Sequence, residues 1–143
     1  MNNTINIKRL TLILALSTQL IACNSSTTLP TPETLSGSWL VQSIKNKPVI
    51  SQSSARLTFD QKNKLSGSAS CNNISTSYSL QNNSISIGPI ATTRKMCLPA
   101  LMQQESLLLQ ALGKVKRFQL NNDQLSMYDH QGSLQIKATK TKP

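Results

Sequence analysis

The chain has 143 residues and carries 15 Lys and Arg against 5 Asp and Glu, a formal net charge of +10 at pH 7. This length allows one domain, and the charge either favours anionic partners (lipid headgroups, lipopolysaccharide phosphates, acidic polymers) or simply keeps the surface soluble. Aromatic residues make up only 3% of the chain, which leaves little for base stacking and argues against nucleic acid as a partner.

Residues 1–22 have the organisation of a secretory signal peptide. Lys8 and Arg9 form a basic start, and an apolar run, 10–21 (LTLILALSTQLI), follows. A helix needs about 20 mostly apolar residues to cross a bilayer, so this run is too short and too polar to be a membrane span. The alternative is a core helix of the folded domain, but no apolar partner for it precedes the polar segment that comes next. We therefore predict that residues 1–22 form a lipoprotein signal peptide.

The end of this segment, Leu20-Ile21-Ala22-Cys23, resembles the lipobox of bacterial lipoproteins. Cleavage before the cysteine of a lipobox leaves a thiol that takes diacylglycerol and an amine that is acylated. Two or more acyl chains hold a protein stably to a membrane. We predict that Cys23 is lipidated; the alternative is ordinary secretion with a free thiol. In enteric-type hosts, an Asp directly after the lipidated cysteine retains a lipoprotein at the inner membrane. This chain has Asn24 at that position, so we expect the protein to lie on the outer membrane and face the periplasm.

Residues 23–34 are predicted to be a flexible tether. Ser, Thr and Pro dominate this segment and it has almost no charge. About 12 such residues span roughly 20 Å on average, so the domain would stand off the membrane but remain close to it.

The remaining two cysteines form an even pair once Cys23 is assigned to the lipid. In an oxidising compartment we predict a disulfide between Cys71 and Cys97, which contributes roughly 3–4 kcal/mol on the chain-entropy model. The alternative is a reactive or metal-binding thiol pair. It has little support, because the chain has one His, His130, and no CxxC spacing. We expect no metal and no other cofactor.

From residue 35 the sequence predicts five short strands before the first helix of the domain. Apolar residues alternate with polar ones along most of them, as on a strand with one buried face. Turn residues at 61–64 (QKNK) and 82–83 (NN) separate neighbouring strands. The predicted strands are 37–44, 56–60, 65–69, 74–80 and 84–90.

Residues 99–112 break the alternation and predict an amphipathic helix. Pro99 suits the first helical turn and Gly113 the position just after the end. An apolar stripe at helical spacing is more often core packing than a membrane or partner surface. The stripe contains Leu101, Leu108 and Leu112, widened by Met102, Leu109 and Ala111, and the residues predicted to face elsewhere are Gln103, Gln104 and Glu105.

Three further alternating strands, 115–120, 124–129 and 133–138, are predicted after the helix, and 140–143 is expected to be a frayed basic tail. Mostly antiparallel strands joined by short turns imply a barrel or a strongly curved sheet. The predicted fold class is therefore α+β: a curved antiparallel sheet or partly open barrel of about eight strands, with one amphipathic helix inserted after the fifth strand. The domain is expected to cover 35–139.

Several segments of the domain together carry a family resemblance. They are 35–39 (LSGSW), 67–73 (GSASCNN), 77–78 (SY), 92–97 (TTRKMC) and 101–105 (LMQQE). In this order and spacing they resemble the META domain of the HslJ-type heat-shock and envelope lipoproteins, over residues 35–138. The resemblance implies a curved antiparallel sheet with one helix and no known activity or cofactor. It also implies loose links to heat shock, novobiocin resistance, secretion and motility.

Two residues depart from this family pattern. Ser70 and Thr76 stand where the family usually has Gly. Because glycine adopts positive φ at little cost, both turns are expected to differ locally from those of the family.

Few residues are supplied for catalysis, and we expect no enzyme and no catalytic residue. His130 lies in a turn beside Asp129, and no Ser is arranged to complete a triad. Trp39 is expected to be a buried core residue; the alternative is that it lines a ligand cavity.

The residues around the predicted disulfide are the candidate site. Arg94 and Lys95, close to Cys97, are a possible anion or partner surface, and the alternative is a solvated pair of charges. Asn72 and Asn73 could bind a ligand, but we expect their side chains to bond the local backbone in a turn.

These observations predict a monomeric, non-enzymatic envelope lipoprotein that supports stress or antibiotic tolerance and envelope integrity. It would act by binding an unknown protein or an anionic envelope component. Two alternatives stay open. A small hydrophobic-ligand carrier is one, because an eight-stranded barrel is either filled by side chains or holds one small ligand. A pilotin-like chaperone that escorts a secretion component is the other.

Overall fold

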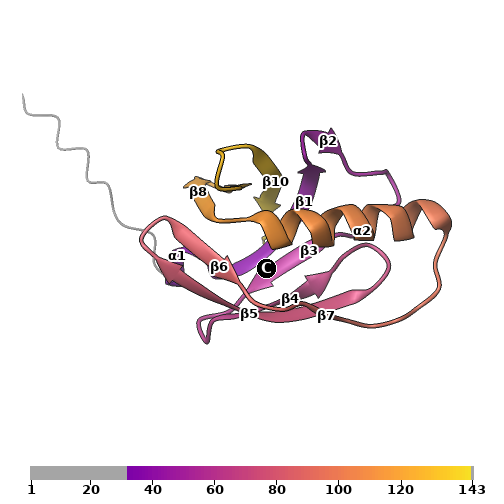
Figure 1. The fold of residues 1–143 in the computed structure, drawn as a ribbon, viewed down its shortest axis with the longest axis horizontal. Coiled ribbons are helices and arrows are strands. Elements are labelled where there is room, and N and C mark those ends of the chain that lie inside the picture. Colours follow the sequence, from indigo (N-terminus) through magenta and orange to yellow (C-terminus); the bar gives the residue numbers. More distant parts are fainter. Residues whose placement is uncertain (1–31, 143) are drawn as a thin grey trace, which may run out of the picture.

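The structure is a computed structural model that describes residues 32–142 (Figure 1). The predicted signal peptide, Cys23 and the tether up to residue 31 lie outside the described residues, as does Pro143. The elements in chain order are α1 (Pro32–Leu35), β1 (Gly37–Ile44), β2 (Lys47–Pro48), β3 (Arg56–Phe59), β4 (Lys64–Ser68), β5 (Asn73–Gln81), β6 (Ser84–Ile87), β7 (Ala91–Thr92), α2 (Pro99–Lys114), β8 (Arg117–Asn121), β9 (Gln124–Tyr128) and β10 (Leu134–Lys140).

Eight of the strands form a closed antiparallel barrel in the order β1-β3-β4-β5-β6-β8-β9-β10. Pairing of β10 with β1, from Trp39↔Lys140 to Ile44↔Ile136, closes it. The two short strands are additions, because β2 pairs with β1 and β7 with β5. The α+β prediction is confirmed, including eight main strands and the helix after the fifth of them.

The pairing between β6 and β8 is the weakest contact in the barrel wall. Only Ser84 and Arg117 are paired there, with two further backbone hydrogen bonds, from Ile85 N to Lys116 O and from Phe118 N to Asn83 O. Every other neighbouring pair of barrel strands is joined over at least four residue pairs.

The elements differ from the sequence prediction at several places. Residues 32–34, predicted to belong to the flexible tether, form helix α1 together with Leu35. The two-residue strands β2 and β7 are too short to show an alternating pattern. Helix α2 continues through Gly113 to Lys114, and the N–H of Val115 then donates to Leu112 O. The predicted frayed tail is wrong for its first residues, because β10 includes Lys140, and Thr141 donates from both its N–H and its hydroxyl to Ser38 O.

Apolar side chains fill the space between the barrel wall and α2. The buried core includes residues from every barrel strand, and the helix contributes Leu108, Ala111 and Leu112. Trp39 is 1% exposed, which confirms its predicted core position, and its indole N–H donates to Leu35 O at 2.9 Å. These side chains form one buried cluster among the described residues, which favours the filled form of an eight-stranded barrel over the ligand-holding one.

Positive φ angles mark the tight turns. Asn63, Asn82 and Asn122 adopt them in the β3–β4, β5–β6 and β8–β9 connections, where Asn tolerates the left-handed region better than most residues. Ser70, which replaces the family glycine, also has a positive φ of 87°, whereas Thr76 does not. At Gly67, a Cβ atom would collide with the carbonyl oxygen of Arg56, so only glycine fits in this part of β4.

The two ends of the barrel differ in what they carry. In Figure 1 the loop from β7 to α2 and the start of α2 lie at the right, whereas α1, where the described domain begins, lies at the left. The β4–β5 connection and the loop before α2, the two segments that contain the candidate site residues of the sequence, lie at this right-hand end (Figure 1).

Candidate functional site

A disulfide fastens the end of the barrel at which α2 begins. Cys71 and Cys97 are bonded, with their Cα atoms 5.9 Å apart. Cys71 is buried in the loop after β4, and Cys97 is half-buried just before α2. The bond ties the loop 93–98 to the barrel wall. The predicted pairing is confirmed, and the alternative of a reactive or metal-binding thiol pair is wrong for these two residues.

The side chain of Asn72, 6% exposed, is a second fastening of the same loop. Its Oδ1 accepts hydrogen bonds from the backbone N–H of Lys95 at 2.7 Å and from the Thr93 hydroxyl at 2.8 Å. Its Nδ2 donates to both carboxylate oxygens of Glu105 at 3.1 Å. The expected local turn bond is therefore wrong, because the fold brings together partners that lie 21 to 33 residues from Asn72 in the chain.

Gln104 holds two further loops to the start of α2. Its Nε2 donates to the hydroxyls of Ser53 and Ser70, and its Oε1 accepts from the backbone N–H of Ile50 at 2.7 Å. The side chain is 6% exposed, so the prediction that Gln104 faces away from the core is wrong. Helical spacing alone identifies a polar residue but not the distant hydroxyls that allow it to be buried.

Large apolar side chains project from this fastened end. Met96 is 89% exposed, Leu98 66% and Met102 40%. Arg94 and Lys95, the predicted anion or partner surface, directly precede Met96 and are exposed as well. We call these five residues the tip patch. Isolated exposed apolar residues need no explanation, whereas contiguous apolar patches with a polar rim are typical of interaction sites.

Met96 and Leu98 were not among the site residues predicted from the sequence. A signal was present, because two large apolar residues flank Cys97 in a loop, next to two cations and just before the first helical proline. Between them, Cys97 is bonded to the buried Cys71 and is half-buried.

Two open grooves run along the sides of α2. One, of about 160 Å³, lies between α2 and the β1–β2 hairpin; it is lined by apolar side chains such as Ile44, Ile50 and Leu107, with Lys47 at its side. The other, of about 250 Å³, is bordered by Met102, Leu109 and the polar residues Asn72, Glu105, Ser106 and Gln110. The second groove adjoins the tip patch through Met102.

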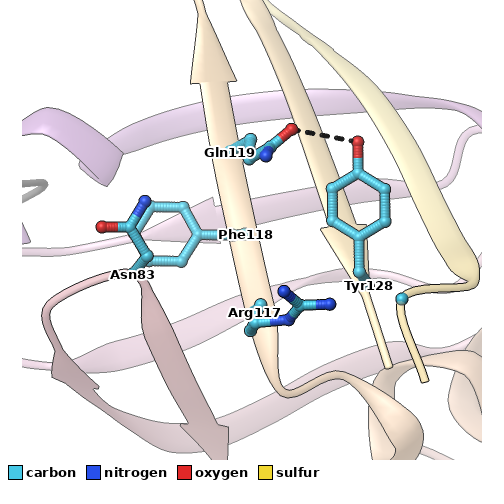
Figure 2. Close-up of a pocket in the computed structure, with 6 residues that line it drawn as sticks. Asn83, Arg117, Phe118, Gln119 and Tyr128 are labelled. Atoms are coloured by element: carbon cyan, nitrogen blue, oxygen red, sulfur yellow. Dashed lines mark hydrogen bonds between the residues drawn. The ribbon is translucent and has the colours of Figure 1, made fainter. Parts of the chain in front are cut away.

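A polar pocket of about 290 Å³ lies at the weak β6–β8 pairing (Figure 2). Arg117, Gln119 and Asn83 border it, and the Tyr128 hydroxyl donates to the Gln119 amide oxygen at 3.2 Å. Arg117 and Gln119 are exposed. With its polar groups already in water, this pocket offers less binding energy than a surface of exposed apolar groups.

Asp129 organises the turn between β9 and β10. Hydrogen bonds from the backbone N–H groups of Ser133 at 2.9 Å and Gln131 at 3.0 Å hold its pKa below the ordinary value. The Gln135 amide and the neighbouring His130 lower this pKa further, while burial opposes them. The carboxylate is thus engaged in holding a turn.

Tyr78 is the other group with a shifted pKa. Burial raises its pKa, with a further contribution from Asp60, and its hydroxyl donates to Asp60 O at 2.7 Å. Among residues 32–142 no three His, Cys, Asp or Glu side chains are placed to hold a metal ion. None of the helices in this range is long and apolar enough to cross a membrane.

A family model described as META domain matches residues 33–141. A search of curated proteins finds no match. Three solved structures are similar, and their chains are almost wholly covered.

The first of these is an NMR structure, 25% identical over 78% of this chain and 96% of its own, with a TM-score of 0.63. The second is an NMR structure of a protein from Burkholderia xenovorans, with 20% identity, 85% and 97% coverage and a TM-score of 0.66. The third is a crystal structure of a DUF4847-family protein from Bacteroides vulgatus, with 14% identity, 76% and 95% coverage and a TM-score of 0.58. The likeness to the second and third is one of fold alone.

Proposed function

The chain belongs to the META-domain family, and we propose that it is a lipid-anchored envelope protein that acts by binding rather than by catalysis. In this role it supports stress or antibiotic tolerance and the integrity of the envelope. The observation that carries the proposal is the tip patch, in which apolar and basic side chains are displayed on a loop fastened by a disulfide.

The disulfide supports a position outside the cytoplasm. Bonds of this kind persist in oxidising compartments and are rare where glutathione keeps thiols reduced. The LIAC segment that ends at Cys23, after a short basic and apolar stretch, supports export and lipidation. A periplasm-facing lipoprotein of the outer membrane agrees with both features.

A binding role is supported by how the polar groups at this end are used. Asn72, Gln104 and Glu105 hold loops in place, and Asp129 holds a turn. Fastening a loop before binding lowers the ordering cost that a partner would otherwise have to offset. Displaying Met96 and Leu98 to water has no benefit for folding, which supports a role in contact with a partner.

The structure bears differently on the two alternative functions, the ligand carrier and the pilotin-like chaperone. A carrier that holds a small hydrophobic ligand in the barrel is disfavoured, because core side chains occupy that interior. A pilotin-like chaperone is favoured by one observation, the exposed apolar residues of the tip patch. It differs from the first proposal in the class of partner and shares the binding surface.

The anchor is tested by the intact mass of the native protein from the membrane fraction, measured without reduction beside a Cys23→Ser form. Acyl chains on residue 23 and two missing hydrogens are expected, and the Cys23→Ser protein should leave the membrane fraction. An unlipidated mass with free thiols would contradict the export, the localisation and the envelope role together.

The physiological role is tested in a deletion strain under heat and novobiocin. Wild-type protein should restore growth, and Cys23→Ser and Met96→Ser/Leu98→Ser should each restore it less. Full rescue by the patch variant at equal protein level would contradict binding through the tip patch.

A further inference from the structure

We propose that the tip patch docks on a phospholipid bilayer with anionic headgroups. Met96 and Leu98 enter the headgroup region, Met102 lies at its edge, and Arg94 and Lys95 contact lipid phosphates. The inference deepens the proposed function and rests on it, since it names the partner of the surface described above.

The shape of the patch favours a bilayer over a protein partner. Met96 is 89% exposed and Leu98 66%, so both side chains stand out from the loop rather than line a groove. A protein partner would need a matching pocket for each protruding side chain to exclude water. The headgroup region of a bilayer deforms around protruding apolar groups and needs no preformed pocket.

The charge of the patch is complementary to an anionic surface. Arg94 and Lys95 are exposed immediately before Met96. Glu105, an acidic residue at this end, is turned toward the barrel, where its carboxylate accepts from the side chain and the backbone N–H of Asn72. Each cation near an anionic leaflet strengthens binding by about fivefold.

The patch is also held in one arrangement before it binds. The Cys71–Cys97 bond fixes its middle. The Asn72 side chain fixes Lys95 through its backbone N–H. Because little ordering is left to do on binding, more of the apolar and ionic attraction appears as affinity.

The chain outside the described residues is long enough for this contact. The loop from β7 to α2 and the start of α2, which carry the tip patch, lie on the opposite side of the domain from α1 (Figure 1). Helix α2, with 16 residues, is about 24 Å long and runs back from the tip over only part of the way to α1. The stretch from Cys23 to Pro32 can reach up to about 30 Å. A domain anchored at Cys23 can therefore lie along the membrane with its tip on the surface.

The experiment separates the patch from the lipid anchor. The mature chain, 23–143 with Cys23→Ser, contains every described residue but carries no acyl group. Its binding is measured by co-sedimentation with vesicles of phosphatidylethanolamine and phosphatidylglycerol at about 3:1, and with vesicles of phosphatidylcholine alone. We expect binding to the first, weakened by added salt, and at least tenfold weaker binding to the second.

Two patch variants and a matched control test the residues. Met96→Ser/Leu98→Ser should bind the anionic vesicles about tenfold less, because the inserted apolar area is lost. Arg94→Ala/Lys95→Ala should lose about 25-fold. The control, Lys62→Ala/Lys64→Ala, removes the same charge from the exposed turn at the other end of β4 and should lose less than about threefold. Thiol titration and Tm show that each variant retains the disulfide and the fold.

Three results would overturn the proposal. They are absence of binding to the anionic vesicles by the parent chain, unchanged binding by Met96→Ser/Leu98→Ser, and a control that loses as much as Arg94→Ala/Lys95→Ala. A photo-crosslinker at position 96 that captures a protein in cells, with no vesicle binding in vitro, would replace the bilayer by a protein partner. None of these results alters the mass of the native protein, so failure here is distinguishable from failure of the lipidation proposal.

Discussion

Replacement of Asn72 by Ala should loosen the tip end of the barrel and destabilise the domain by about 3 kcal/mol. The Oδ1 atom loses two hydrogen bonds, to Lys95 N–H and the Thr93 hydroxyl, worth about 1 kcal/mol each. The Nδ2 atom loses its bond to the Glu105 carboxylate, which adds about 1.5 kcal/mol because the acceptor is charged. Water reaching the half-buried partners offsets part of this sum.

The measurement is thermal and urea unfolding of the mature chain with the disulfide intact. For a domain of this size, about 3 kcal/mol corresponds to a fall in Tm of roughly 12 °C. Asn73→Ala, at the next position, is a matched control. The Asn73 side chain is exposed, and the residue bonds to Thr93 through its backbone N–H and C=O alone. It should change the free energy of unfolding by less than about 0.5 kcal/mol. Equal effects of the two substitutions would refute the assigned role of Asn72.

Three further predictions concern other parts of the structure. At Ser70, with φ of 87°, substitution by Ala should destabilise the domain by about 1–2 kcal/mol, because the hydrogen bonds to Gln104 and Ser53 are lost while the backbone strain stays. Substitution by Gly should leave the free energy of unfolding within about 1 kcal/mol of wild type, because the strain is relieved. Urea unfolding in which the Ala variant is more stable than the Gly variant would contradict this. Asp129 has a folded-state pKa below its ordinary value of 3.8. The stability that its carboxylate contributes is therefore complete above about pH 4 and is lost as the pH falls through the lower, folded-state pKa. Asp129→Asn should flatten the fall in the free energy of unfolding at acid pH, and an unchanged slope would show that other groups cause this fall. Reduction of the Cys71–Cys97 bond should lower the free energy of unfolding by about 3 kcal/mol. It should also make the loop 93–98 the first site of proteolysis, which mass spectrometry of the cleavage products would map. Protease resistance equal to that of the oxidised protein would refute the role of the bond in holding this loop.

Much of the fold could be predicted from local patterns. Alternation such as Leu57 and Phe59 against Arg56 and Thr58 depends only on neighbouring residues, and it indicates both the strand and its buried face. Pro99 marks the start of α2 for a similarly local reason. Closure of the barrel was left open between a curved sheet and a barrel, because it depends on residues about a hundred positions apart, such as Trp39 and Lys140.

The candidate site was only partly predictable. The disulfide followed from counting cysteines, and the exposed pair Arg94 and Lys95 from their position beside Cys97. The roles of Asn72 and Gln104 did not follow, since each finds its partners across loops that only the closed barrel brings together. A polar residue with no local partner is predicted to face solvent, although a distant donor or acceptor can allow its burial.

The pairing of the first barrel strand with the last has a consequence for how the protein is made. Residues in β1 have partners both nearby, in β3, and about a hundred positions later, in β10. Contacts of such long sequence separation form slowly, because the loop entropy must be lost before they contribute. On the proposed export route, in which the chain crosses a membrane from its N-terminus, the wall therefore cannot be completed until β10 has crossed. Until then β1 and β9 both present open edges, which are templates for pairing with other chains, so truncation just before β10 should yield aggregated protein instead of a smaller soluble barrel.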